Sequence, residues 1–245
     1  MGDVMTKHSS ARLSRAEIEA IGAYAAKAVW PAGFTLYQRG AAADGLFVVL
    51  RGRIVLRSRV KAGRGFVPAI ATAGETFGAE GLSPGGHYAT DARADDESET
   101  YHLSGARYRA FVREQPQHAI ALVGQVMAEH ASLLDKLREL ATLSVEQRLV
   151  ATLLRMAQDA SFVGDDGRIT LDAPQYRLLC EMVGATRESV SLVLSRLIGD
   201  GLAERQGTTF VVAPASELAQ RIADTWRSDT PVAWAVEKEN GRASL

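Results

Sequence analysis

The chain has 245 residues, 47% of them apolar and 23% charged, with a formal net charge of −1. These values fit a globular protein with one large or two smaller buried cores, and they exclude a polycation that binds nucleic acid through a broad basic surface. No apolar run is long enough to span a membrane or to act as a signal peptide, and the one cysteine, Cys180, lacks a partner for an intrachain disulfide, so we expect a cytoplasmic protein.

The first part of the sequence predicts a tail followed by a short helix. Residues 1–13 are expected to form a flexible tail. Ser14 and Glu17 have the spacing of a capping box, in which each side chain bonds to the backbone N–H of the other residue. This pair predicts a helix that begins at Ser14 and ends at the break formed by Pro31 and Gly33.

Short apolar runs separated by glycines predict β structure over residues 34–101. The clearest runs are 46–50 and 54–56, which we expect to form a hairpin across a tight turn at Gly52. A further strand is predicted at 66–70. Several short strands with glycines between them are typical of a β-roll or barrel.

A helical segment follows, in which apolar positions recur at alternating steps of four and three residues. These positions are Ala119, Val123, Val126, His130, Leu133, Leu137 and Leu140. A sustained period of this kind is typical of a seam between two helices and predicts a dimer contact. The alternative is an amphipathic helix that packs on its own domain. A second capping-box pair, Ser144 and Gln147, predicts that a new helix begins after the seam.

The C-terminal third predicts a helix-turn-helix and a hairpin. Asp172 can cap one helix, and Thr186 can cap the next, which ends near Ile198. Two helices joined by a three-residue turn with glycine, here residues 184–186, are typical of a helix-turn-helix. Residues 202–212 then predict a β hairpin, the wing.

The second of these helices carries side chains suited to DNA. Its apolar stripe, which we expect to be buried, consists of Val190, Val193, Leu194 and Leu197. Arg187, Glu188 and Ser191 lie on the other face near the N-terminus of the helix. Arginine can pair with guanine O6 and N7, and glutamate can accept from cytosine N4. The alternative is a module whose polar face meets a protein or ligand instead of DNA.

Together these features resemble the CRP/FNR family, the cyclic-AMP receptor protein and its relatives. Residues 183–190, Val-Gly-Ala-Thr-Arg-Glu-Ser-Val, resemble the family's recognition segment. Residues 46–54 are similar to its β-roll hairpin, and residues 74–78 resemble the entry to its ligand cassette. These landmarks follow the order of the family from about residue 20 to residue 213.

The resemblance implies an α+β chain. Its parts would be a cyclic-nucleotide-binding-like β-roll (14–114), a dimerisation helix (115–143), a winged helix-turn-helix (144–215), and a C-terminal helix and tail (216–245). The resemblance also implies a homodimer that binds near-palindromic operators in double-stranded DNA and contacts RNA polymerase. No metal-ligand spacing, Walker loop or nucleophile elbow is present, so we expect no enzymatic activity.

The recognition helix departs from the family at one position. Where the family usually has arginine, this chain has Leu192, which cannot hydrogen-bond a base but can contact a thymine methyl group. We therefore expect an operator that differs from the usual family half-site, with Arg196 on a phosphate. The predicted DNA-binding residues are Thr186, Arg187, Glu188, Ser189, Ser191, Leu192 and Arg196.

The ligand cassette departs further. The family holds the ribose hydroxyl with a glutamate and the cyclic phosphate with an arginine, where this chain has Ala79 and Ala89. A phosphate without its arginine loses its strongest contact, so we predict weak or absent binding of cyclic AMP. The family's adenine-contacting pair aligns with Leu133 and Leu134. The candidate effector-site residues are Gly78, Ala79, Glu80, Gly81, Leu82, Tyr88, Ala89, Thr90, Leu133 and Leu134.

Other effectors remain as alternatives. One cysteine cannot ligate an iron–sulfur cluster, and no metal site is predicted. His130 in the seam and His87 in the cassette are candidates for an axial haem ligand, but no cysteine or second histidine lies at a nearby helical spacing, which disfavours haem. For His130 we favour a role in setting the register of the seam over a pH or metal switch. A regulator that acts without an effector is the corollary.

Overall fold

The computed structural model describes residues 12–59, 65–159 and 162–220. Within these residues the chain separates into two compact units. The first unit contains the residues up to Arg148 and Cys180–Arg187, and the second contains Leu149–Leu179 and the residues from Glu188 onward. No helix in the described ranges is long and apolar enough to cross a membrane.

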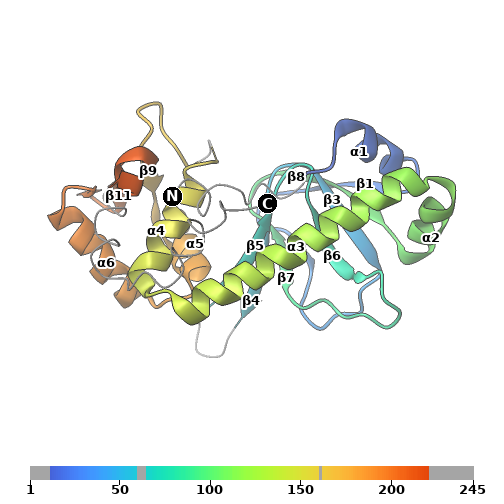
Figure 1. Cartoon of the computed structure of the whole chain (residues 1–245), viewed down its shortest axis with the longest axis horizontal. Helices are drawn as coiled ribbons and strands as arrows, with labels where there is room; N and C mark the ends of the chain where they lie inside the picture. Colours follow the sequence, from blue (N-terminus) through green and yellow to red (C-terminus); the bar gives the residue numbers. More distant parts are fainter. Residues whose placement is uncertain (1–11, 60–64, 160–161, 221–245) are drawn as a thin grey trace, which may run out of the picture. The chain divides into compact units, whose positions relative to one another are not determined.

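The first unit is built around two antiparallel sheets of four strands each. Figure 1 labels these strands except β2. The strands are β1 Ala26–Trp30, β2 Thr35–Tyr37, β3 Gly45–Arg51, β4 Ile54–Arg59, β5 Gly65–Ala71, β6 Thr76–Gly81, β7 Asp91–Ala94 and β8 Ser98–Leu103. One sheet has the order β1-β8-β3-β6 and the other β2-β7-β4-β5. Their core contains aromatic rings from both sheets, among them Tyr37, Phe47 and Phe77. The predicted β-roll is confirmed.

Three helices complete this unit: α1 Arg15–Gly22, α2 Gly105–Glu114 and α3 Pro116–Thr142. Ile21, Phe111 and Leu122, one from each helix, are buried in a second core cluster with side chains of β3 and β8. The predicted capping box at the start of α1 is present, because the Ser14 hydroxyl and the Glu17 carboxylate each accept from the other residue's backbone N–H. The sequence did not predict α2.

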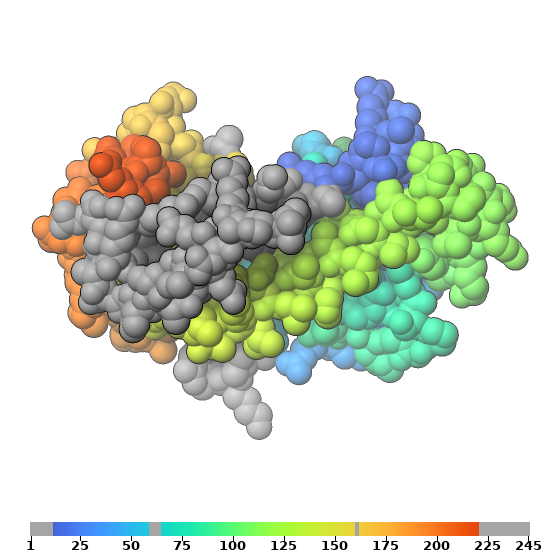
Figure 2. Space-filling model, viewed as in Figure 1, coloured from blue at the N-terminus to red at the C-terminus, as the bar shows by residue number. Residues whose placement is uncertain are grey.

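One face of α3 packs on the β-roll, and another face is exposed. Ala119, Leu122 and Gln125 are buried. The large exposed apolar residues of α3 are Ile120, Val123, Met127, Leu133, Leu134 and Leu137. Much of the helix lies open on the face shown in Figure 2. The predicted seam is wrong at Ala119, which is 5% exposed and belongs to the core of its own unit.

The predicted hairpin of 46–50 with 54–56 is also wrong in its pairing. Both strands exist, as β3 and β4, but β3 pairs with β6 and β8, whereas β4 pairs with β5 and β7. Gly52, at φ +83°, carries the chain from one sheet to the other. A side chain at this position would collide with Ser98. The turn is therefore tight, as predicted, but it separates two sheets.

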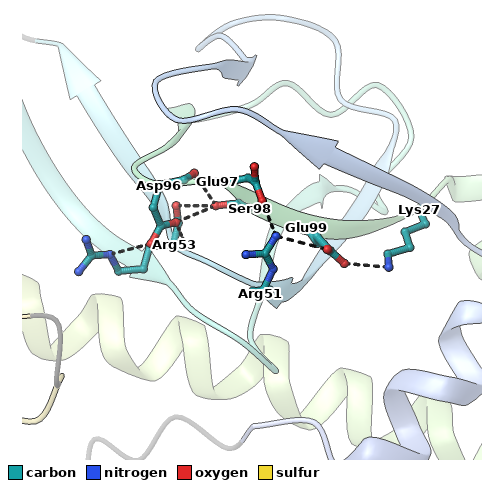
Figure 3. A network of polar contacts seen from close by, with 7 residues as sticks. All are labelled: Lys27, Arg51, Arg53, Asp96, Glu97, Ser98 and Glu99. Atoms are coloured by element: carbon teal, nitrogen blue, oxygen red, sulfur yellow. Dashed lines mark hydrogen bonds and ion pairs between the residues drawn. The ribbon is translucent and has the colours of Figure 1, made fainter.

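Charged side chains hold this crossing against the turn between β7 and β8, as Figure 3 shows. The backbone N–H of Arg53 donates to Asp96 Oδ1 at 2.8 Å. The Arg51 guanidinium lies 2.6 Å from a Glu97 carboxylate oxygen and 3.5 Å from one of Glu99. These partners lie more than forty positions later in the chain, so a local sequence pattern cannot reveal the crossing.

Two predictions for the N-terminal region are wrong. The first helix ends at Gly22, well before Pro31, because residues 26–30 form β1 and pair with β8. The predicted tail is too long, because Leu13 is buried in the core and its N–H donates to the Gly74 carbonyl at 2.9 Å. The rest of that tail, residues 1–11, lies outside the described residues.

The remaining elements are α4 Val145–Met156, β9 Ile169–Leu171, α5 Ala173–Val183, α6 Arg187–Gly199, β10 Ala203–Gln206 and β11 Thr209–Val212. The capping box of Ser144 and Gln147 precedes α4 as predicted. The three strands form an antiparallel sheet in the order β10-β11-β9. Residues 215–220 are helical, with Leu218 buried. The remainder of the predicted C-terminal helix and tail lies outside the described residues.

Candidate nucleic-acid interface and sensor site

A pair of local hydrogen bonds marks the start of α5, and a glycine marks its end. The N–H of Gln175 donates to Asp172 Oδ1, and the N–H of Asp172 donates to Gln175 Oε1, both at 2.8 Å. After Val183 the chain leaves the helix at Gly184, whose φ of +66° is unfavourable for residues with a Cβ. The next helix, α6, begins at Arg187. The predicted helix-turn-helix is confirmed.

The two faces of α6 differ sharply in exposure. Val190, Val193, Leu194 and Leu197 are each at most 6% exposed. The exposed side includes Arg187, Glu188, Ser191, Leu192 and Arg196, whereas Thr186 and Ser189 are half-buried. The first turns of α6 therefore present charged and hydrogen-bonding side chains together, which is what a helix in the major groove requires.

Leu192 is 58% exposed, although it lies on this otherwise polar face. Ser195, which was not among the predicted contacts, is exposed one turn after Ser191 and donates its hydroxyl to the Ser191 carbonyl at 2.9 Å. An isolated exposed leucine needs no special explanation. On a surface that faces base edges, however, its methyl groups match the thymine methyl.

The wing hairpin of β10 and β11 presents an arginine that was not among the predicted DNA-binding residues. Arg205 is exposed, and its guanidinium lies over the Phe210 ring, 5.6 Å from the centroid, while Nε donates to the Gly207 carbonyl at 3.0 Å. Phe210 in turn stacks on Tyr176 at 5.4 Å. The available signal was an arginine just before the glycine of the predicted wing turn.

Several predicted effector-site residues pack against other parts of the β-roll instead of facing a ligand. Ala79, Leu82 and Tyr88 pack in the two core clusters, and Gly81 lies against the backbone of Gly45. Gly78 adopts φ +73°, and a Cβ there would lie 3.2 Å from the Tyr88 ring. The segment is therefore a tightly packed strand end, and its glycines serve close packing.

Glu80 closes the loop that joins β6 to β7. Its Oε1 accepts a hydrogen bond from the backbone N–H of Ala89 at 3.1 Å. Backbone N–H groups in a glycine-rich turn are typical partners for a bound anion. In this chain one of them is engaged by the protein's own carboxylate.

Tyr37, on β2, lies beside this loop but was missed by sequence reasoning. Its ring stacks on Tyr88 with centroids 3.6 Å apart and planes within 8°. Burial raises the pKa of Tyr37, the charge of Glu80 raises it further, and a hydrogen bond with Thr90 opposes the rise. Burial also raises the pKa of Tyr88. Both phenols stay neutral near pH 7. Only the pairing of β2 with β7 brings Tyr37 here, so no local pattern could identify it.

The other predicted sensor residues do not join this cluster. Leu133 and Leu134 are 41% and 54% exposed on α3. His130 is exposed on the same helix, and His87 lies exposed in the loop, in an isolated bridge to Ala42. Among the described residues, no group of histidine, cysteine and acidic side chains is suited to hold a metal ion.

Comparison with known families finds two matches along the chain. Residues 27–115 match the cyclic nucleotide-binding domain, and residues 147–221 match the Crp-like helix-turn-helix domain. The first covers the β-roll, and the second covers the helices and wing described above.

Curated relatives and solved structures agree with these matches. The cAMP-activated global transcriptional regulator CRP of Haemophilus influenzae is 26% identical over 75% of this chain and 82% of its own length. A CRP-like cAMP-activated regulator of Mycobacterium tuberculosis is 23% identical over 78% and 86%.

The structure of the c-di-GMP responsive global regulator CLP of Xanthomonas campestris has the same fold, with a TM-score of 0.71 and 22% identity over 82% of this chain and 99% of its own. A CRP/FNR-family regulator of Thermus thermophilus gives a TM-score of 0.69 at 21% identity, over 80% and 97%. With both family domains in order along the chain, and with the helix-turn-helix formed as its sequence predicts, the chain belongs to the CRP/FNR family of DNA-binding transcription regulators.

Proposed function

We propose that this regulator reads a near-palindromic operator as a homodimer, with the exposed face of α6 in the major groove. The observation that carries the proposal is the division of α6 into a buried apolar stripe and an exposed face that begins with Arg187 and Glu188. Arginine can bind guanine through two hydrogen bonds, and glutamate can accept from the amino group of cytosine. Leu192 would contact a thymine methyl, and Arg196 a phosphate.

The exposed apolar face of α3 supports the homodimer. Ile120, Val123, Met127, Leu134 and Leu137 are 49% to 74% exposed. With His130 between them, their spacing follows a heptad repeat. A second copy of the helix would cover them. A two-fold protein then fits a two-fold site, with half-site centres about 10 bp apart. As the family implies, we also propose that the bound dimer contacts RNA polymerase.

We further propose that the sensor has lost the usual contacts to cyclic AMP and that operator binding does not depend on this nucleotide. Residues 78–90 contain no lysine or arginine, and the carboxylate of Glu80 occupies a backbone donor there. An anionic phosphate would lack a cationic partner and would meet a negative charge. A regulator that still responds to a cyclic nucleotide is the second candidate, favoured by the family match over residues 27–115.

Selection of bound fragments from a pool of random duplex DNA, with the full chain and no added nucleotide, tests the proposal. We expect enrichment of one sequence with two-fold symmetry, and a gel shift of that sequence which excess random DNA does not abolish. Binding that is equally weak to all duplexes would contradict sequence recognition and would favour a module that binds a protein or ligand.

A further inference from the structure

Two polar side chains are buried on the face of α3 that packs against β6. Gln125 and Glu129 lie one helical turn apart and therefore on the same face. Gln125 is 3% exposed. Gln125 Oε1 and Glu129 Oε2 are both buried and without a hydrogen-bond partner. An apolar pair would pack here without this cost, so the two side chains require an explanation.

The strand across from them adds one hydroxyl. Thr76, at the start of β6, is 3% exposed, and its Oγ1 makes no hydrogen bond of standard geometry. An ionised carboxylate and an amide oxygen can only accept hydrogen bonds, whereas a protonated carboxyl can donate one. A proton on Glu129 would therefore supply a donor on a face of α3 where the buried oxygens of Gln125 and Glu129 have no hydrogen-bond partner.

The charges around Glu129 favour that proton. Burial raises the pKa of Glu129 to about 7, the negative charges of Glu80 and then Glu75 contribute to the rise, and Thr76 opposes it. Tyr37, on β2, lies within the electrostatic reach of Glu129 and is itself neutral. The cation on this side, Arg12, is 63% exposed and lies 3.9 Å from Glu75.

The other elements packed on α3 offer no buried counterion at this point. β5 carries no ionisable side chain. α1 meets the N-terminal part of α3 through Ile21, near Ala119 and Leu122, and its charged pair Arg15–Glu19 is exposed. On α2, Arg107, Arg109 and Arg113 are exposed, and Glu114 at its end accepts a hydrogen bond from Tyr24.

We propose that Glu129 is a proton-binding site of the sensor unit, occupied when α3 is packed on β6 and emptied as the solution becomes alkaline. The ligand is the proton itself, which is exchanged with water or buffer. The ionised carboxylate is then buried near the negative charges of Glu80 and Glu75, which the nearby Thr76 hydroxyl offsets in part, and it weakens the packing of the long helix on the roll. Any effect on operator affinity rests on the proposed function, whereas the proton site does not.

The direction of the pH dependence follows from linkage. The folded chain keeps a proton on Glu129 up to about pH 7, whereas the unfolded chain releases it near the ordinary value of 4.5. Between these pH values the folded state binds more protons, so this group makes the free energy of unfolding fall as the pH rises. Above pH 7 its contribution stays constant.

The test follows unfolding by urea from pH 5 to pH 8.5 in the full chain and in two variants. Glu129→Gln keeps the shape and cannot ionise, so we expect the fall in stability between pH 5 and about pH 7 to be largely lost. Glu19→Gln, an exposed carboxylate on α1, is the matched control and should keep the wild-type slope. An unchanged slope in Glu129→Gln would overturn the proposal.

A direct titration keeps the proposal testable if Glu129→Gln does not fold. Glutamate carboxyl carbons are labelled with ¹³C and followed by NMR, and we expect one resonance to titrate near neutral pH in the wild type. Glu80→Gln should lower that midpoint, because it removes a neighbouring negative charge. If every glutamate titrates in the ordinary acid range, the proposal is wrong. Loss of operator binding at all pH values would contradict the proposed function. It would not affect this titration, because the NMR experiment measures the proton on Glu129 without DNA.

Discussion

At the scale of the residue, position along α6 separates two exposed arginines. Arg187 stands at the first position of the helix, from which we propose that it reaches base edges, whereas Arg196 lies in the last turn. Arg187 follows directly on Thr186, which is half-buried, so its backbone position is fixed by the turn. The two arginines should therefore contribute to affinity in different ways.

Arg187→Ala should weaken binding to the selected operator by about 1–3 kcal/mol and relax the preference for the base it contacts. Arg196→Ala is the matched comparison, and it should weaken binding to operator and random DNA alike and reduce the salt dependence. Fluorescence anisotropy on both duplexes at several salt concentrations measures these effects. Equal losses on both duplexes for Arg187→Ala would make it a phosphate contact only.

At the scale of the element, α3 combines two roles on two faces. The buried face, with Ala119 and Leu122, holds the helix on the β-roll, and the exposed face offers apolar side chains to a partner. Since burial in the single chain already separates these faces, substitutions on each should have separable effects.

Leu137→Ser, at a position 63% exposed, should leave the folding of the chain nearly unchanged and weaken the dimer. Leu122→Ala, at a position 1% exposed, should instead cost about 2–5 kcal/mol of folding stability, because it opens a cavity in the core. Analytical ultracentrifugation reports the dimer, and urea denaturation reports the fold. A Leu137→Ser protein that dimerises like the wild type would exclude this face as the seam.

How well an element could be predicted from the sequence depends on whether local or long-range contacts form it. Segments with a strong local signal were predicted well, such as the capping boxes at Ser14 and Ser144 and the turn at Gly184. The strand at 26–30 was missed because only its pairing with β8 makes it a strand. In the candidate site, the exposed face of α6 was predicted from its periodicity. Tyr37 and Glu129, in contrast, come close to Tyr88 and Glu80 of the cassette through tertiary packing alone.

At the scale of the whole molecule, the sensor unit has the fold of a cyclic nucleotide-binding domain, and its cassette, residues 78–90, carries Glu80 and no lysine or arginine. Glu80 accepts a hydrogen bond from the Ala89 N–H, and the negative charges of Glu80 and Glu75 both act on Glu129. An incoming cyclic phosphate would have to displace one carboxylate and approach others, with no arginine or lysine in residues 78–90 to offset the repulsion.

Isothermal titration calorimetry of the full chain with cyclic AMP should therefore give weak or undetectable heat, and operator affinity should change little when the nucleotide is added. The physical reason is the cost of bringing a phosphate to a site without a cation. The CRP of Haemophilus influenzae, a cAMP-activated relative, is the positive control. Micromolar or tighter binding, coupled to a clear gain in operator affinity, would contradict the prediction.

The crossing at Gly52 also bears on how fast the sensor unit folds. Because β3 and β4 belong to different sheets, they cannot pair with each other as a local hairpin. Instead β3 pairs with the distant strand β8, with Leu46 opposite Leu103. The chain loses conformational entropy when this long loop closes, before the strand pairing can stabilise it. Folding rates therefore fall as contacts become less local. The wing, where Gln206 pairs with Thr209, needs no such search. Refolding of the roll should therefore be the slower of the two, and its unpaired strand edges should remain available to other chains for longer during synthesis.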